Sequence, residues 1–203
     1  MNRKVWEREL QGHHVEAFGM FGDQSKHLLW RLIHGEHVVQ AKHVGILIGT
    51  NDLGYKAFKA KEEGGSNLEV VQRAIEEEGY AYARKGMQLV VEYLMENKRR
   101  SDQEIVIIGI LPRGTRLDTI ASNRRYTMPS EFTGTIERLN SYFESYASKQ
   151  EKSGVRFHDC SEKFLTREGS NVYLESRFMP DGLHPTGDGA EALAACLKEA
   201  FSL

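Results

Sequence analysis

The chain has 203 residues, of which 40% are hydrophobic and 28% charged, and its formal net charge is −2. These values are typical of a soluble globular protein, and the length suits a single domain. The near balance of 27 basic and 29 acidic side chains gives no electrostatic reason to expect nucleic acid or an anionic membrane as a partner.

The sequence contains no segment that predicts a membrane span or a metal centre. No apolar run approaches the ~20 residues that cross a bilayer, and residues 1–6 (MNRKVW) contain no signal-peptide core. The two cysteines, Cys160 and Cys196, have no CxxC spacing, so we expect unpaired packing residues in a reducing compartment. The histidines show no zinc-ligand spacing. We therefore expect a cytoplasmic protein without metal or cofactor.

Four short apolar runs predict β-strands. The two middle runs are continuously apolar rather than alternating, which is typical of strands buried on both faces of a parallel sheet. In chain order the runs are Val15–Met20, Val44–Thr50 (VGILIGT), Ile105–Leu111 (IVIIGIL) and Val155–Asp159 (VRFHD).

Between and after these runs, apolar residues recur at helical spacing. The stripes are Leu28, Leu29, Leu32 and Ile33; Met87, Val90, Val91 and Leu94; Ile136, Leu139, Phe143 and Tyr146; and Leu193, Leu197 and Ala200. The charged stretch 55–79, with Gly64-Gly65-Ser66 at its centre, is expected to be an exposed loop that leads into a helix. Strands that alternate with helices predict an α/β doubly wound fold.

In such a fold the ligand site lies beyond the carboxyl ends of the strands. After the first run comes Gly19–Asp23 (GMFGD), where a glycine lets the backbone approach a ligand and direct an N–H at an anion. The alternative is an ordinary turn with Asp23 or Ser25 as helix N-cap. After the second run, Asn51 can direct its amide at a developing oxyanion, which lowers the barrier by about 3 kcal/mol in acyl transfer. The alternative is an Asx turn of Asn51 and Asp52.

The stretch 181–185 (DGLHP) places an acid three residues before a histidine. The spacing allows Asp181 to accept a hydrogen bond from one ring nitrogen of His184, which leaves the other nitrogen in the tautomer that takes a proton from a nucleophile. Pro185 and the following helix would hold the loop in place. The alternative is turn chemistry alone.

Taken together, these glycine, asparagine and aspartate–histidine signals resemble the SGNH (GDSL-type) hydrolase family. Within it the chain is most similar to the α subunits of intracellular platelet-activating-factor acetylhydrolase, from about Trp6 to the C-terminus, with a poor match over residues 55–79. The resemblance implies a flavodoxin-like, three-layer α/β/α parallel sheet. The resembling stretches are Phe18–Leu32, Val44–Asp52, Ile108–Gly114 and Asp181–Gly189.

The resemblance also implies a role for each candidate residue. The backbone of Gly22 and the side chain of Asn51 would form the oxyanion hole. His184 would be the general base and Asp181 its orienting acid. Phe21 departs from the pattern, in which a small residue precedes the glycine, and this puts the local shape of the oxyanion hole in doubt.

The family's nucleophile lies in a GDS motif at the end of a strand that precedes everything matched here, and the sequence contains no such motif. Ser25 is not expected to be the nucleophile, because it should lie in a helix cap where its hydroxyl serves the backbone. The missing strand is central in the family, between the strands matched by Val15–Met20 and Val44–Thr50, so its loss would leave two strand edges unpaired. We therefore expect a single SGNH-like domain that lacks its first strand, as an N-terminally truncated version of a longer hydrolase, with about 30 residues missing.

The resemblance implies a serine-type hydrolase of carboxylic esters with short acyl groups such as acetyl, carried on a lipid, carbohydrate or small-molecule alcohol. Transfer to an acceptor other than water stays open. The alternative is a non-catalytic relative that binds an acylated ligand or a partner subunit. A further alternative is a dimer, such as a homodimer, in which another chain donates the missing strand.

Overall fold

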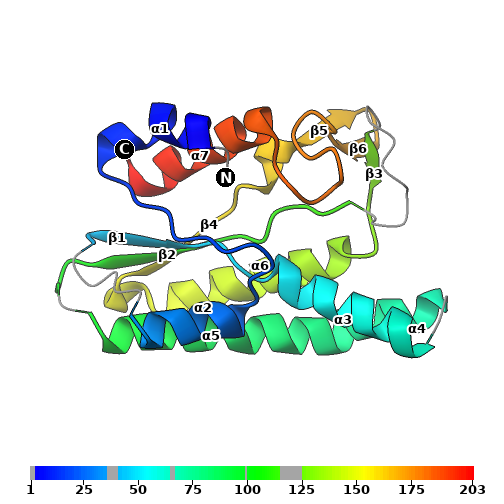
Figure 1. The fold of residues 1–203 in the computed structure, drawn as a ribbon, viewed down its shortest axis with the longest axis horizontal. Coiled ribbons are helices and arrows are strands. Elements are labelled where there is room, and N and C mark those ends of the chain that lie inside the picture. The colour runs from blue at the N-terminus through cyan, green and yellow to red at the C-terminus, as the bar shows by residue number, and fades with distance from the viewer. Residues whose placement is uncertain (1–2, 36–40, 65–66, 99, 115–124) are drawn as a thin grey trace. The chain divides into compact units, whose positions relative to one another are not determined.

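The computed structural model describes residues 3–35, 41–64, 67–98, 100–114 and 125–203. They divide into two compact units, and Figure 1 labels the helices and strands. Unit 1 comprises Met1–Phe18, Leu111–Thr133 and Cys160–Leu203, and unit 2 comprises Gly19–Ile110 and Gly134–Asp159.

Unit 2 contains a parallel three-stranded sheet in the order β1-β2-β4. Its strands are β1 (His43–Ile46), β2 (Glu104–Ile108) and β4 (Val155–His158), and they confirm three of the four predicted strands. Residues 105–108 of β2 are all buried, as a continuously apolar run predicts. In β1 the burial alternates and Gly45 is exposed, so the prediction that β1 is buried on both faces is wrong.

The prediction of a strand over Val15–Met20 is wrong. The structure assigns no regular element to these residues, and Phe18 and Met20 are 52% and 63% exposed. A strand needs a neighbour to satisfy its backbone groups. Within the described residues, β1 is hydrogen-bonded as a strand to β2 alone, so this run has no strand to pair with.

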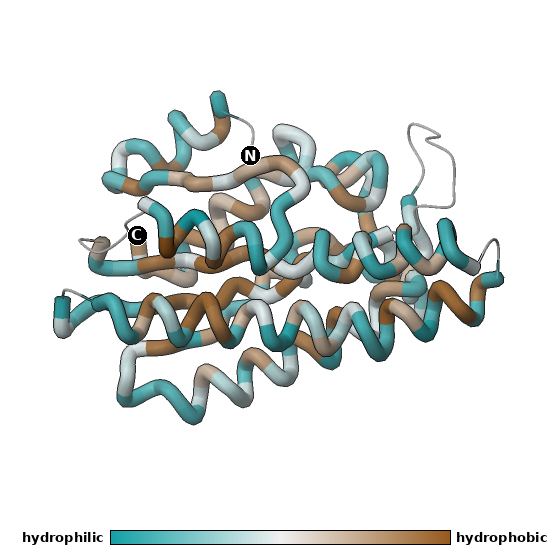
Figure 2. The backbone as a smooth tube through the Cα atoms, turned by 60° about the horizontal axis from the view of Figure 1, so that its bottom comes forward, coloured by the Kyte–Doolittle hydropathy of each residue, from teal (hydrophilic) through white to brown (hydrophobic). Residues whose placement is uncertain are grey.

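Three long helices of unit 2 confirm the predicted apolar stripes. They are α2 (Ser25–Ile33), α5 (Tyr80–Glu96) and α6 (Thr133–Lys149). The first residue of α6, Thr133, is assigned to unit 1. Brown and teal segments alternate along the tube in Figure 2, as expected of helices with one buried face. The buried positions include Leu32 in α2, Met87, Val90, Val91 and Leu94 in α5, and Ile136, Leu139 and Phe143 in α6.

The charged stretch 55–79 is helical rather than an exposed loop. It is covered by α3 (Thr50–Gly64), α4 (Leu68–Arg73) and a π-helical segment, Ala74–Gly79. The Oδ1 of Asn67 accepts hydrogen bonds from two backbone N–H groups and thereby caps α4. A sparse apolar stripe, in which Leu53, Ala57, Ala60, Val71 and Ile75 are buried, gives the stretch its packed face. Gly65 and Ser66 lie outside the described residues.

Unit 1 contains a small antiparallel sheet that the sequence did not predict. Its order is β3-β6-β5, with β3 (Tyr126–Met128), β5 (Leu165–Glu168) and β6 (Asn171–Leu174). These strands have three or four residues each and are largely half-buried or exposed, so they lack the apolar run by which the other strands were recognised.

Two helices of unit 1 pack against each other. They are α1 (Arg3–Glu9) and α7 (Gly187–Phe201), and α7 confirms the last predicted apolar stripe. Lys198 of α7 forms an ion pair with Glu9 of α1 at 2.7 Å. The remaining elements of the described chain are short helical turns at Gln11–His13, Glu151–Ser153 and Ser161–Phe164. None of the described helices is long and apolar enough to cross a membrane.

Cys160 and Cys196 form a disulfide, with their Cα atoms 5.8 Å apart. The prediction of two unpaired cysteines is therefore wrong. The residues are 36 positions apart in sequence, and both are almost fully buried. The pairing depends on where Ser161–Phe164 and α7 pack in unit 1, which a sequence with only two cysteines does not reveal.

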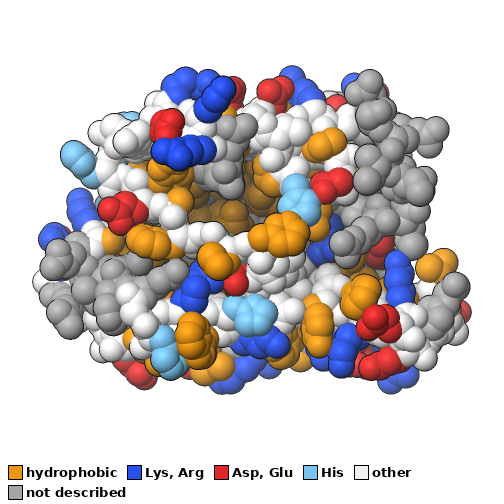
Figure 3. Space-filling view, in the orientation of Figure 1, with side chains coloured by type: hydrophobic (Ala, Val, Ile, Leu, Met, Phe, Trp, Pro, Cys, Tyr) orange, Lys and Arg blue, Asp and Glu red, His pale blue; other side chains and the backbone are white. Residues whose placement is uncertain are grey.

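Several large hydrophobic side chains reach the surface. Figure 3 shows orange side chains at several separate places on one face, set among white and charged groups. The exposed hydrophobic residues of unit 2 include Phe58 in α3 and Leu68 in α4, whose exposed fractions are 50% and 63%. Isolated apolar groups of this kind are normal for a folded protein.

Candidate active site

Unit 1 brings the predicted acid and base into direct contact. The Oδ2 of Asp181 lies 2.6 Å from the Nδ1 of His184. The Oδ1 of the same carboxylate accepts hydrogen bonds from the backbone N–H groups of Leu183 at 3.0 Å and His184 at 2.7 Å. The sequence allowed either a turn or an oriented histidine, and the Asp181 carboxylate serves both. One oxygen makes the turn, and the other holds the imidazole.

The loop that carries this pair is fixed to its surroundings at several points. Gly182 has φ +71°, which favours glycine, and a Cβ at this position would lie 2.9 Å from the Cα of Gly114. The carbonyl of Gly182 accepts a hydrogen bond from Gly114 at 2.8 Å, and the hydroxyl of Tyr126 donates to the carbonyl of Pro180 at 2.9 Å. Thr186 closes the loop by capping α7 with its side chain.

The charge on Asp181 decides the tautomer of His184. Partial burial acts to raise the pKa of the carboxyl, but the hydrogen bonds from His184 and Leu183, together with the charge of His184, lower it below its usual value. The carboxylate is thus ionised at neutral pH and only accepts hydrogen bonds. The proton between the two groups therefore belongs to Nδ1, and the neutral imidazole carries its lone pair on Nε2, as a general base requires.

In unit 2, Gly22 lies in the turn before α2. Its φ of +77° lies in the left-handed region, and no atom comes within 4 Å of the place where a Cβ would stand. Within the described residues, the backbone N–H of Gly22 has no hydrogen-bond acceptor. Phe21 is 93% exposed, so its large side chain does not fill the space at the glycine. The turn can therefore present an N–H to a ligand despite this departure from the family pattern.

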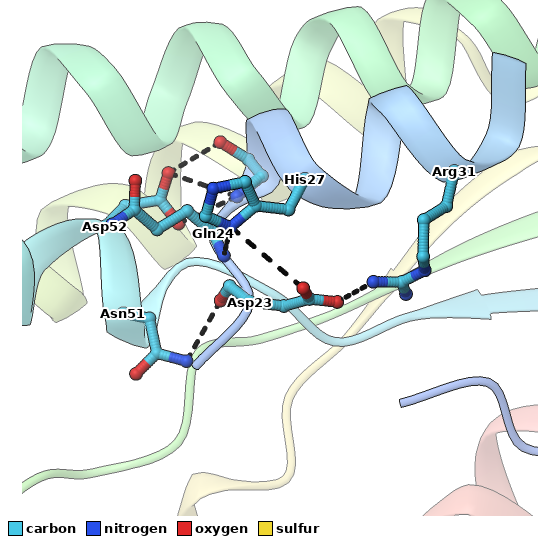
Figure 4. A network of polar contacts seen from close by, with 7 residues as sticks. Asp23, Gln24, His27, Arg31, Asn51 and Asp52 are labelled. Carbon is cyan, nitrogen blue, oxygen red and sulfur yellow. Dashed lines mark hydrogen bonds and ion pairs between the residues drawn. The ribbon is translucent and has the colours of Figure 1, made fainter. Parts of the chain in front are cut away.

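Asn51 lies in the first turn of α3, which begins a short loop after the carboxyl end of β1, rather than in an Asx turn. Its Nδ2 donates a hydrogen bond to the backbone carbonyl of Asp23 at 2.9 Å (Figure 4). That carbonyl belongs to the residue next to Gly22. Within unit 2 the side chain of Asn51 is thus hydrogen-bonded to the residue that directly follows Gly22.

Ser25 is the first residue of α2 and is only 1% exposed. Its Oγ donates to the Oδ1 of Asp52 at 2.5 Å, and its backbone N–H lies 3.1 Å from the Oδ2 of the same carboxylate. The hydroxyl therefore serves a buried carboxylate rather than the backbone, and the N-cap of α2 is Gln24 rather than Asp23 or Ser25.

Asp52 is 0% exposed. Burial raises the pKa of its carboxyl, and the hydrogen bonds from Ser25 offset only part of this effect. Because the pKa of Asp52 is higher in the folded than in the unfolded protein, its contribution lowers the free energy of unfolding as the pH rises from the unfolded pKa through the folded pKa.

A residue of α2 holds the side chain of Asp23 in place. Arg31 forms an ion pair with it, and each of the two side chains is 14% exposed. The Nδ1 of His27 accepts a hydrogen bond from the backbone N–H of Gln24 at 3.2 Å. Figure 4 shows the side chain of Asp23 between those of His27 and Arg31.

Gly86 of α5 lies against Ser25, and we expect Gly86→Ala to destabilise the protein by about 1–3 kcal/mol. A Cβ at Gly86 would overlap the Oγ and Cβ of Ser25. Helix propensity acts in the opposite direction, because alanine is better than glycine within a helix by about 1 kcal/mol, so the sign of the change tests the contact. Urea denaturation measures it.

Gly134 of α6 is the matched control for this substitution. No atom lies within 4 Å of its Cβ position, so Gly134→Ala is expected to leave stability equal or raise it by up to ~1 kcal/mol. If both alanine variants were stabilised equally, the close packing of Ser25 on α5 would be contradicted.

The predicted site residues thus fall into two pairs. Asp181 and His184 are brought together in unit 1, and Gly22 and Asn51 are connected in unit 2. The assembly of the two pairs into one active site stays a prediction. The sequence analysis did not predict the supporting roles of Arg31 in unit 2 and Thr186 in unit 1, and it considered Asp52 in unit 2 only as part of an Asx turn. An acid directly after Asn51, which itself follows an apolar run, was the available signal for Asp52.

Known proteins are similar to this chain over nearly its whole length. A family model described as GDSL-like lipase/acylhydrolase matches residues 2–197. The human platelet-activating factor acetylhydrolase IB subunit alpha2 is 23% identical over 197 residues, which cover 97% of this chain and 68% of that protein. The bovine (Bos taurus) subunit alpha1 is 25% identical over 123 residues, which cover 60% of this chain and 42% of that protein.

Solved structures share the fold. A GDSL-like lipase from Bacteroides thetaiotaomicron has a TM-score of 0.66 at 19% identity, over 98% of this chain and 80% of that one. A catalytic mutant of an acetylxylan esterase from Geobacillus stearothermophilus has a TM-score of 0.56 at 15% identity, over 99% and 78%. Because the family model matches nearly the whole length, this chain belongs to the GDSL-like lipase/acylhydrolase family.

Proposed function

We propose that this protein hydrolyses carboxylic esters by serine-type acyl transfer. His184 is the general base, Asp181 holds it in the required tautomer, and the N–H of Gly22 and the Nδ2 of Asn51 stabilise the oxyanion. The observation that carries the proposal is the 2.6 Å contact between Asp181 and His184, because a binding protein has no need of an oriented base.

The proposed substrates are esters of short acyl groups such as acetyl. Similar proteins are named acetylhydrolases, and another is an acetylxylan esterase. A pocket that fits acetyl rejects longer chains, and each methylene is worth about 1–3 kcal/mol in discrimination. The alcohol can be that of a lipid, a carbohydrate or a small molecule.

In this proposal the nucleophile is a serine that belongs neither to the Asp181–His184 pair nor to the Gly22–Asn51 pair. Ser25 is buried, and its Oγ is engaged by Asp52, so it does not reach a substrate. We propose that the serine is supplied by a strand that pairs with the β1 edge, on a segment upstream of Met1 or on a second chain.

One observation favours a second function. Because the sequence has no GDS motif, a non-catalytic protein that binds an acylated ligand or a partner subunit is the alternative. Such a protein would keep the fold and the oxyanion-binding groups and would show no turnover.

The test is hydrolysis of p-nitrophenyl acetate, butyrate and octanoate by two forms of the protein: the 203-residue chain and the chain extended by its in-frame upstream sequence. We expect the extended form to be active, with kcat/KM at least ~10-fold higher for acetate than for octanoate. Labelling with a fluorophosphonate, followed by mass spectrometry, identifies the serine. Two folded but inactive and unlabelled forms would favour the binding function.

The same assay decides the role of Ser25. We expect Ser25→Ala to keep measurable activity, with a loss no greater than about tenfold, because only a supporting hydrogen bond is removed. Loss of a nucleophile instead costs a factor of about 10⁴ or more. Loss of all activity and of the fluorophosphonate label in Ser25→Ala would show that Ser25 is the nucleophile.

A further inference from the structure

Two consecutive residues of α3 hold the segment that leads into α2. The Nδ2 of Asn51 donates to the carbonyl of Asp23 at 2.9 Å. One residue further on, the carboxylate of Asp52 accepts the Oγ of Ser25 at 2.5 Å and its N–H at 3.1 Å. Figure 4 shows Asn51 and Asp52 beside Asp23 and Gln24. All of the residues belong to unit 2.

We propose that Asp52 is a positioning residue for the oxyanion side of the site, and that it acts through Ser25 to fix the Gly22 turn against the amide of Asn51. This inference rests on the proposed function, because it assigns Asp52 a task in ester hydrolysis. It places Asp52 outside contact with the substrate, since the side chain is 0% exposed.

The geometry of these contacts leaves the turn little freedom. A single carboxyl group accepts both the Oγ and the backbone N–H of Ser25, so it holds that residue at two points. The carboxylate stands at the amino ends of two helices at once, in the first turn of α3 and on the first N–H of α2, where a negative charge is favoured. It therefore fixes the starts of α2 and α3 relative to each other, and with them the residues on which the oxyanion hole depends.

Stability alone does not account for a carboxylate at this place. Burial penalises the ionised form, and apolar residues of similar volume often replace buried charges without loss of stability. What an apolar residue cannot do is hold the Oγ and N–H of Ser25 in a fixed direction. Catalytic groups need that fixed direction, because a displacement of about 1 Å can lower the rate ~100-fold.

The test compares Asp52→Ala, Asp52→Asn and Ser25→Ala with the control Gln103→Ala. Gln103 is also buried and polar, at 2% exposed, and its Nε2 donates to the carbonyl of Ala41 at 2.7 Å. It immediately precedes β2 and therefore lies at the amino end of that strand. The control thus removes a buried polar contact at the amino end of the central strand β2, whereas Asp52 follows the carboxyl end of β1.

On the ester-hydrolysing form, Asp52→Ala is expected to lower kcat about 10- to 100-fold while KM changes less than ~3-fold. Asp52→Asn keeps one acceptor oxygen and should recover part of that loss, and Ser25→Ala should lose less than Asp52→Ala. Gln103→Ala should leave kcat unchanged when rates are compared per folded molecule. A kcat for Asp52→Ala equal to that of Gln103→Ala would overturn the proposal.

A second readout needs no turnover. In ¹⁵N NMR spectra of the 203-residue chain, Asp52→Ala should shift the backbone amide of Gly22 and the side-chain amide of Asn51, and speed hydrogen exchange at the N–H of Ser25 at least ~10-fold. Gln103→Ala should do neither. If the protein proves inactive, the proposed function fails while these signals still decide the positioning role. If Asp52→Ala does not fold, Asp52→Asn and Ser25→Ala give the same comparison, and unmoved signals in both would contradict it.

Discussion

Replacing His184 by alanine is expected to lower kcat/KM for ester hydrolysis by at least about a thousandfold. The imidazole is the proposed acceptor of the nucleophile's proton, and no other group in the described part of the chain is paired with Asp181 in this way. The side chain of His184 is 56% exposed, so its removal should leave the free energy of unfolding within about 1 kcal/mol of the parent value. Rates must be measured on the form that hydrolyses esters.

Asp181→Asn separates the two tasks of the carboxylate. The asparagine oxygen can still accept the N–H groups of Leu183 and His184, which maintains the turn. Its NH₂ group would then face the Nδ1 of His184 and donate to it, which moves the imidazole proton to Nε2 and leaves no lone pair for the nucleophile. In a serine protease the corresponding change costs about 10⁴ in kcat, and we expect a loss of ~10³ to 10⁴ here.

The tautomer itself can be observed without activity. The ¹⁵N shifts of the His184 ring should report a proton on Nδ1 in the parent chain and on Nε2 in Asp181→Asn. Because the pKa of Asp181 is lowered, its contribution to stability is complete above the pKa of an ordinary aspartate. That contribution is lost only as the pH falls through the lower folded value. The Nδ1 proton of the parent chain should therefore persist throughout the neutral range.

Asp188→Asn is the matched control. Asp188 lies in the first turn of α7, a few residues from His184, and is exposed. Its replacement removes the same charge without touching the imidazole, so kcat/KM should change less than about twofold and stability by a few tenths of a kcal/mol. Equal losses in Asp181→Asn and Asp188→Asn would mean that charge near the loop, rather than the hydrogen bond, is what matters.

The acid–base pair could be predicted from the sequence because it is local. Asp181 and His184 are three positions apart, and the turn geometry of such a spacing is limited. The contact between Ser25 and Asp52 spans 27 positions, and that of Cys160 with Cys196 spans 36. Partners at such distances are chosen by the packing of whole helices, which residue patterns do not encode.

The helices and strands, too, could be predicted where the evidence for them is local in the sequence. The helices α2, α5, α6 and α7 were predicted because their apolar residues recur at close helical spacing. In α3 and α4, ion-paired charges such as Lys59 with Glu63 and Arg73 with Glu77 surround a sparse apolar stripe, and composition suggested a loop. For Val15–Met20 the error was the opposite one, because a strand was predicted where the structure has no regular element. These residues favour a strand, but a strand also needs a neighbour, and local propensity does not supply one.

Reducing the Cys160–Cys196 disulfide is expected to lower the free energy of unfolding by about 4 kcal/mol. The bridge closes a segment of 36 residues, and the loss of chain entropy in the unfolded state gives roughly this value for such a length. The change is a large part of the 5–15 kcal/mol typical of a domain. Urea denaturation with and without a phosphine reductant measures it.

A Cys160→Ala, Cys196→Ala double variant controls for effects of the reductant, and its stability should not respond to it. Each single variant should lose about as much as the double variant, because either change breaks the same bond. Two free thiols in the denatured, unreduced parent chain, with equal stability in both conditions, would contradict the disulfide. That outcome would instead support the prediction of a reducing compartment, since cytosolic thiols are kept reduced.

Reduction of the disulfide should lower the folded fraction near the unfolding temperature more than it lowers kcat of the folded protein. The bonded residues bracket the segment that contains Asp181 and His184, but the hydrogen bond between these two depends on a turn of four residues and on Thr186 at the start of α7. Well below the unfolding temperature, the reduced protein should therefore keep the Nδ1 tautomer of His184 and at least about half of its kcat. Near that temperature, kcat should fall together with the folded fraction, because the reduced unfolded state has gained entropy. A loss of the tautomer in a folded, reduced protein would show that the bridge also orients the base.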